Sequence, residues 1–384
     1  MGYSLGFWLE DEKNSSSPME DKKNRVELHI NYWSLEAKQI CNYLDIGLRL
    51  ELKDENLKKI HFYLPFKLAK ENYMGNLGDV ICSKNDLIEL IFNEKLNSSS
   101  EGVNYKDIIF AGKEKETLRL YKELETGSEG SNVIFTFDEE NTGTKISFPS
   151  EIFNKENLKN EVEHKYYHYF RFRLRLTPEH VKVLSQNYEP QDRLVVSKFE
   201  KTEIIDFRLN ELRDLPGAIC NALKNNFILE QIHFFLIRDI HDELKLAHDK
   251  YKRCRLLEKK VWDKYLEFKN DYSVLPIQML IYHFKEKNND LLHIERFNAF
   301  AKFARVKVTF TSIAAFVFCV VILGAIGSLI ATVFVESRPL GLYAFFKNIS
   351  FHIFISIIIL CTIFCVVRAF WNKNYEFQCP WRKK

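Results

Sequence analysis

Two long apolar runs close to the C-terminus dominate the hydrophobic pattern of this chain. Residues 308–335 and 349–367 contain no Asp, Glu, Lys or Arg. Because a bilayer's hydrocarbon core is about 30 Å thick, roughly 20 apolar helical residues are enough to cross it. The pattern therefore predicts a transmembrane hairpin. Its parts are helices over residues 308–335 and 349–371, a short external loop over 336–348, and a basic tail over 372–384.

Basic residues flank the outer ends of this predicted hairpin. Positively charged flanks favour the cytoplasmic side of a membrane. We therefore expect an integral membrane protein, in the inner or plasma membrane if bacterial, whose N-terminal domain and C-terminus are cytoplasmic. The flanking residues are Arg296, Lys302, Arg305 and Lys307 before the first span, and Arg368, Lys373, Arg382, Lys383 and Lys384 after the second.

Small residues form one face of the first predicted span. Gly324, Gly327, Ser328 and Ala331 follow the i, i+3, i+4, i+7 spacing of a helix face. Such faces let helices in a membrane approach closely. The partner of this face is either the second span or another copy of the chain, in which case the protein self-associates through this helix.

The rest of the chain mixes strand and helix patterns without a regular alternation, which favours an α+β domain with a mixed or antiparallel sheet. We expect this domain over residues 25–289, with a subdomain boundary near 97–104, after a disordered polar tail over residues 1–24. Apolar residues at spacings of three and four predict a long helix over 239–268. An amphipathic juxtamembrane linker helix is expected over 290–307.

The clearest strand signal is YYHYFRFRLRL at residues 166–176. Period-two alternation places aromatic and leucine side chains on one face and Arg171, Arg173 and Arg175 on the other. A row of guanidinium groups is suited to an anionic ligand. The alternative is pairing with acidic residues of a neighbouring strand, such as Glu200, Glu203 or Asp206.

Charge and cysteine content narrow the choice of partners. The chain has 384 residues and a formal net charge of +3, from 55 Lys plus Arg and 52 Asp plus Glu. The excess of positive charge lies in residues 307–384, whereas residues 1–306 are slightly acidic, so nucleic acid is not an expected partner. The eight cysteines include no CxxC pair, which argues against a zinc ribbon. No metal and no cofactor are predicted.

Motifs for catalysis are absent from the sequence, including GxxxxGK[ST], GxGxxG, HExxH and GxSxG. The nearest approach to a catalytic group is His241 with Asp242, in HDELKLAHD. A second His-Asp pair follows seven residues later, which is about 10 Å along a helix and too far to share one metal ion. A solvated helix face is the alternative interpretation.

These patterns lead to one functional hypothesis and two alternatives. The first is a non-enzymatic membrane protein in which a cytoplasmic domain binds a ligand or protein partner and is coupled to the hairpin. By architectural analogy alone it is an oligomeric membrane effector of the antiviral-defence kind. The alternatives are a passive membrane-anchored scaffold and a membrane-tethered metal-dependent hydrolase that uses His241 and Asp242.

Overall fold

A computed structural model describes residues 3–12, 22–35, 42–54, 56–124, 136–140, 143–153, 164–188, 200–223, 226–267, 278–288, 293–306 and 310–337, together with His352 and Ser356. The chain divides into two units. The first comprises Met1–Pro190 and Glu200–Val306, and the second comprises Gln191–Phe199 and Lys307–Lys384. Each unit is described by itself.

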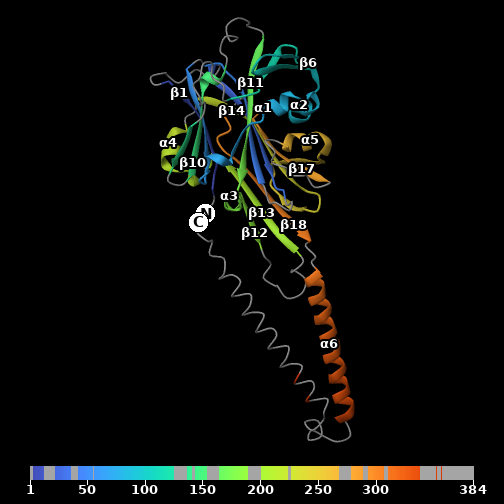
Figure 1. The fold of residues 1–384 in the computed structure, drawn as a ribbon. Coiled ribbons are helices and arrows are strands. Elements are labelled where there is room, and N and C mark those ends of the chain that lie inside the picture. Colours follow the sequence, from blue (N-terminus) through green and yellow to red (C-terminus); the bar gives the residue numbers. More distant parts are fainter. Residues whose placement is uncertain are drawn as a thin grey trace. The chain divides into compact units, whose positions relative to one another are not determined.

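A large mixed sheet is the centre of the first unit (Figure 1). The parallel pairs are β14 with β2 and β11 with β8, and the other pairs are antiparallel. In spatial order the strands are β16 (Tyr251–Leu256), β17 (Met279–Lys287), β14 (Phe227–Asp239), β2 (Asn24–Trp33), β3 (Asn42–Glu51), β11 (Lys165–Leu176), β8 (Glu116–Tyr121), β7 (Tyr105–Phe110) and β6 (Leu96–Glu101), with β5 (Tyr73–Asn76) also paired to β11.

Two smaller antiparallel sheets and several short helices complete this unit. The first small sheet has the order β1 (Gly6–Asp11), β4 (Leu57–Leu64), β10 (Gly143–Pro149) and β9 (Thr136–Glu140). The second has the order β12 (Ser185–Tyr188), β13 (Glu200–Leu209), β18 (Phe297–Val306) and β15 (Glu243–Ala247). The helices are α1 (Gly78–Cys82), α2 (Asn85–Phe92), α3 (Pro178–Leu184), α4 (Gly217–Ala222) and α5 (Lys259–Leu266), with 3-10 turns η2 (Lys70–Asn72), η3 (Ser150–Ile152) and η6 (Leu212–Asp214).

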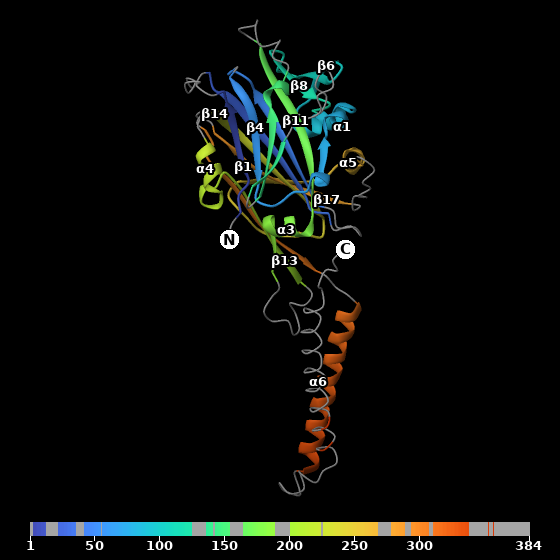
Figure 2. The same cartoon turned by 60° about the vertical axis from the view of Figure 1, so that its left-hand side comes forward.

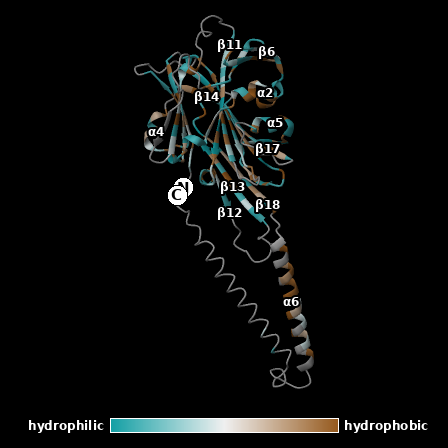
Figure 3. Ribbon diagram, viewed as in Figure 1, coloured by the Kyte–Doolittle hydropathy of each residue, from teal (hydrophilic) through white to brown (hydrophobic). Residues whose placement is uncertain are grey.

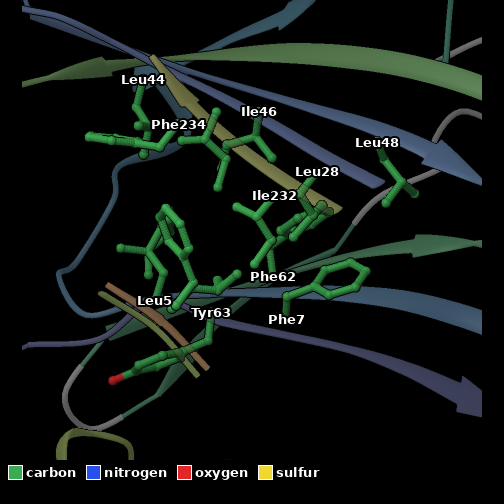
Figure 4. Packing of buried hydrophobic residues seen from close by; sticks show 14 of the residues in the cluster. Leu5, Phe7, Leu28, Leu44, Ile46, Leu48, Phe62, Tyr63, Ile232 and Phe234 are labelled. Atoms are coloured by element: carbon green, nitrogen blue, oxygen red, sulfur yellow. The ribbon is translucent and has the colours of Figure 1, made fainter. Parts of the chain in front are cut away.

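Period-two alternation gives the large sheet two different faces. One face packs its aliphatic and aromatic side chains against those of β1 and β4, and Figure 4 shows Leu28, Ile46 and Phe234 opposite Phe7 and Phe62. The opposite face packs in part against α1, α2 and α5, which lie together on one side of the sheet (Figure 1 and Figure 2). Apolar and polar residues are interspersed along the strands in Figure 3, as this two-faced arrangement requires.

The α+β class with mixed and antiparallel sheets is confirmed. The predicted strand at residues 166–176 is also confirmed, as β11, whose Phe170 and Phe172 enter the core between the sheets while Arg171 and Arg173 point to the other face. A long alternation of apolar and polar residues identifies a strand, because every second side chain of a strand lies on the same face of the sheet.

Three predictions about local structure are wrong. The long helix over 239–268 is instead the end of β14, strands β15 and β16, and the short helix α5. The linker helix over 290–307 is mostly strand β18. The N-terminal tail over 1–24 contains β1, whose Phe7 and Leu9 are buried. In each case pairing with distant strands outweighs the local pattern, because a strand's preference depends on its neighbours.

The second unit contains helix α6 (Phe310–Ser337), which covers most of the first predicted span. Apart from His352 and Ser356, the second span at 349–371 lies outside the described residues, as do 338–348 of the loop and the whole tail at 372–384.

Within the ranges that the structure describes, no helix is both long enough and apolar enough to pass through a membrane. This finding contradicts the predicted hairpin. It also contradicts the integral-membrane localisation, the bilayer as a partner, and the membrane effector, scaffold and tethered-hydrolase functions that depended on the hairpin.

Candidate metal centre

A polar pocket lies on the face of the large sheet that also carries α2. Its volume is about 640 Å³, within the range of about 300–1,000 Å³ typical of small-molecule sites. Strands β2, β3, β14, β16 and β17 and the C-terminal end of α2 supply most of its lining. Among the lining residues are three histidines: His29, His233 and His283.

Strand register brings these side chains together. In the parallel pair of β2 and β14, Glu27 is opposite Gln231 and His29 is opposite His233. Because paired residues share a face of the sheet, all four side chains point into the pocket. On the next strand, β17, His283 follows the same period and lies opposite Phe235, two residues beyond His233.

One carboxylate oxygen is the point on which the cluster converges. His29 Nε2 lies 2.7 Å from Glu27 Oε1, His233 Nε2 lies 3.2 Å from it, and Gln231 Nε2 donates to it at 2.9 Å. One ligand atom each from Glu27, His29 and His233 lies within 4.8 Å of the others. Two ligands that each lie about 2 Å from a zinc ion are at most about 4 Å apart, and the separations of 2.7 Å between Glu27 and His29 and 3.2 Å between Glu27 and His233 are below this limit.

The far side of each potential ligand is also held in place. His233 Nδ1 is 2.9 Å from His283 Nε2, and His29 Nδ1 is 3.4 Å from the Tyr169 hydroxyl. The second oxygen of Glu27 is 3.5 Å from Arg49 Nη1. Metal-binding histidines in proteins have outer partners of this kind, which fix the ring and the tautomer.

Tyr169 reaches His29 across Gly47 of β3. A Cβ atom at Gly47 would lie 2.4 Å from the Tyr169 hydroxyl and 2.9 Å from Arg171 Nε. Both distances are far shorter than a van der Waals contact. The absence of a side chain at this strand position therefore gives Tyr169 the space in which it lies over the sheet.

Protonation states in the cluster suit a metal ion. Burial lowers the pKa of His29 to about 4, despite its hydrogen bond to Glu27. Burial, with the nearby His233 and Arg253, lowers the pKa of His283 to about 3. Burial alone would raise the pKa of Glu27, but hydrogen bonds from His233 and His29 hold it well below its usual range. At neutral pH the His29 and His283 imidazoles are therefore neutral and the Glu27 carboxylate is charged, and metal ions bind these forms.

Hydrogen bonds alone do not satisfy His233 well. Its Nε2 would have to donate to Glu27, yet the same atom also contacts the amide nitrogen of Gln231, which is itself a donor. One ring nitrogen cannot donate and accept at once. A cation among His233, His29 and Glu27 would use the lone pairs of all three.

The predicted arginine row is positioned mainly by internal contacts. Arg173 forms two hydrogen bonds with Asp45, at 2.7 and 3.0 Å, and Asp45 also accepts from Tyr265 and Trp33. Arg171 is 1% exposed and lies 3.4 Å from the Tyr265 hydroxyl. Arg175 is half-buried. Arg173 thus pairs with an acidic residue of the neighbouring strand β3, whereas two of the named candidates have other partners: Glu203 pairs with Arg238 and Asp206 with Arg208. Anion binding by this row remains a prediction.

The other predicted residues lie outside this pocket. Asp242 is buried and accepts from Arg238 Nε at 2.7 Å and from Arg305 Nε at 2.5 Å, whereas His241 is exposed in the turn after β14. Gly324 and Gly327 of α6 are exposed, and a Cβ on either would meet no atom within 4 Å. A catalytic role of His241 and a packing role of the glycines remain predictions.

Two short segments of the sequence carry the signal for this cluster. The segments Glu27-Leu-His29 and Gln231-Ile-His233 share one pattern, in which two polar residues flank an apolar one on a strand. Period two places both polar residues of each segment on the same face. Only the parallel pairing of β2 and β14 makes the two segments neighbours.

Comparisons with known proteins do not assign a family. No family model and no curated protein matches this chain. One matching solved structure is "Fcho1 Mu homology domain (Danio Rerio) with bound Eps15 peptide", at 5% identity, with 80% of this chain and 81% of that chain covered and a TM-score of 0.15. A TM-score of this size does not establish a common fold.

Proposed function

We propose that this chain binds one divalent transition-metal ion through Glu27, His29 and His233, and that this centre is its functional site. The observation that carries the proposal is the convergence of the three ligand atoms within 4.8 Å. Two histidines and one carboxylate form the ligand set of many catalytic zinc and iron centres.

The coordination that this set offers is incomplete. Structural zinc sites use four protein ligands, usually cysteine or histidine, whereas sites that act on a ligand keep at least one position open. Here the three ligands lie at the floor of a pocket of about 640 Å³. A metal at this place would therefore have both an open position and room for a bound molecule.

Measurement of bound metal tests the proposal. The full chain is treated with a chelator, dialysed against zinc, and analysed by elemental mass spectrometry, with about one zinc per chain as the expected result. His233→Ala is expected to reduce zinc affinity by more than about tenfold, because changing even an outer partner of a ligand has an effect of that size and this change removes a ligand itself.

His248→Ala is the matched control, because it removes an imidazole that does not line the pocket. This variant should retain about one zinc per chain. Equal zinc content in wild type and His233→Ala would refute the proposal and leave a hydrogen-bonded cluster that only stabilises the fold.

A further inference from the structure

Basic side chains line one wall of the pocket next to the proposed metal centre. In the register of β17 with β14, Lys285 is opposite His233 and Lys287 is opposite Gln231. In the register of β16 with β17, Arg253 is opposite His283. Three cationic side chains thus follow the row of polar residues that contains His233.

Most other charges in the pocket neutralise one another. Arg25 pairs with Glu230 at 2.9 Å, and Lys113 pairs with Glu94 at 2.7 Å. Arg49 lies 3.5 Å from Glu27. The remaining glutamates of the lining also have basic partners: Glu51 with Arg25 and Glu116 with Arg49.

The cations of the basic wall differ from these residues. In the described ranges of the chain, no ion pair connects Arg253, Lys285 or Lys287 to a carboxylate, and Arg253 instead donates to Asn93 at the end of α2. Lys285 is half-buried. Partial burial of a charged ammonium that has no carboxylate in direct contact is unfavourable, so an anion in the pocket would be stabilised there.

We infer that the pocket binds a phosphate group, with one oxygen on the metal and others on Lys285 and Arg253. This inference rests on the proposed metal centre. Phosphate fits the arrangement because its several oxygens can contact a metal and two cations together, and because lysine and the guanidinium fork of arginine both recognise phosphate. The volume of about 640 Å³ also leaves room for the rest of a phosphate ester.

A cobalt-loaded full-length protein separates the two proposals. Cobalt(II) replaces zinc at such sites and gives a visible absorption spectrum that reports its ligands. Inorganic phosphate, titrated against chloride at constant ionic strength, should change this spectrum with saturation. A phosphate monoester, AMP, is titrated in parallel. The compound with the lower dissociation constant shows whether the site is built for free phosphate or for a phosphate ester.

Substitution of the basic wall supplies the decisive comparison. Lys285→Met should weaken phosphate binding at least about tenfold, the effect of losing one hydrogen bond to a charged group. Lys285→Arg should retain most of the wild-type affinity for phosphate. Lys252→Met is the matched control, because Lys252 is exposed on β16 and does not line the pocket. An unchanged cobalt spectrum before phosphate is added shows that Lys285→Met is folded.

Each failure has its own signature. A normal cobalt spectrum that responds to neither phosphate nor AMP would refute phosphate binding and leave the metal centre intact. Equal phosphate affinity in Lys285→Met and wild type would also refute it. Absence of any cobalt spectrum would refute the metal centre itself, and the phosphate site with it.

Discussion

Buried histidines of the large sheet differ in their contacts, and the contacts set their chemistry. His29 faces the pocket and contacts Glu27, whereas His168 of β11 lies on the opposite face of the sheet, against Phe153. The Tyr121 hydroxyl and His168 Nδ1 form a hydrogen bond of 2.7 Å. The imidazole of His29 can therefore serve as a metal ligand, whereas that of His168 is enclosed among aromatic rings.

Burial of His168 makes stability depend on pH. Burial and the nearby Arg119 lower its pKa to about 4, from about 6.5 in an unfolded chain. Below pH 6.5 the unfolded chain binds a proton that the folded chain does not, so stability falls as the pH drops from 6.5 towards 4, by up to about 3 kcal/mol for one such histidine.

His168→Phe should remove this contribution. Urea unfolding between pH 6.5 and 4 is therefore expected to show a shallower loss of stability in the variant than in wild type. The loss should not vanish, because burial also lowers the pKa of His29 to about 4 and of His283 to about 3. Parallel pH curves for the two proteins would contradict this assignment of His168.

Strand β18 forms in a segment for which the sequence pattern predicts a helix. Residues 290–307 contain many apolar positions, which fit a helix face in part. The stretch from Phe297 to Phe303 also alternates, because Phe297, Ala299, Ala301 and Phe303 are each 1% exposed. Strand β18 pairs with β13 on one side and β15 on the other, and in such a strand alternate side chains face the core.

Consecutive residues of β18 should therefore respond in opposite ways to one substitution. Ala299→Glu places a charge in the core and is expected to cost at least about 3 kcal/mol of unfolding free energy. Asn298→Glu, on the exposed side, should change it by less than about 0.5 kcal/mol. Chemical denaturation measures both. Similar effects at the two positions would argue against the strand.

The segment 239–268 failed as a prediction for a related reason. Its apolar residues recur at spacings of three and four, but the chain turns after Asp239 and again at residues 248–250, where backbone hydrogen bonds close the turns. Strands β15 and β16 then join different sheets. A helical period in the sequence does not exclude two strands whose partners are far away along the chain.

For the molecule as a whole, the metal centre connects two distant parts of the first unit. Glu27 and His29 come from β2, whereas His233 comes from β14, some two hundred residues later. A metal ion held by both strands binds the folded chain but not an unfolded one, so it should stabilise the entire unit by linkage. Free zinc at 100 times its dissociation constant corresponds to about 2.7 kcal/mol.

Chelated protein should accordingly unfold at a lower denaturant concentration than protein saturated with zinc. His233→Ala should show little or no difference between the two conditions, because one ligand is missing. Thermal and urea melts with and without zinc measure the effect. Equal stabilisation of wild type and His233→Ala by zinc would place the binding at another site.

The sequence alone determined the α+β class and the alternating strand β11, because both depend on patterns that extend over many consecutive residues. It did not predict the metal centre: Glu27 and His29 are ordinary strand residues until β14 pairs with β2 in the register that places His233 beside them. Pairing between segments remote in sequence likewise decided whether residues 239–268 and 290–307 form helix or strand. The same pairing determined the partner of Arg173 and the position of the basic wall. Such pairing depends on the energy of the whole sheet, which no local pattern contains.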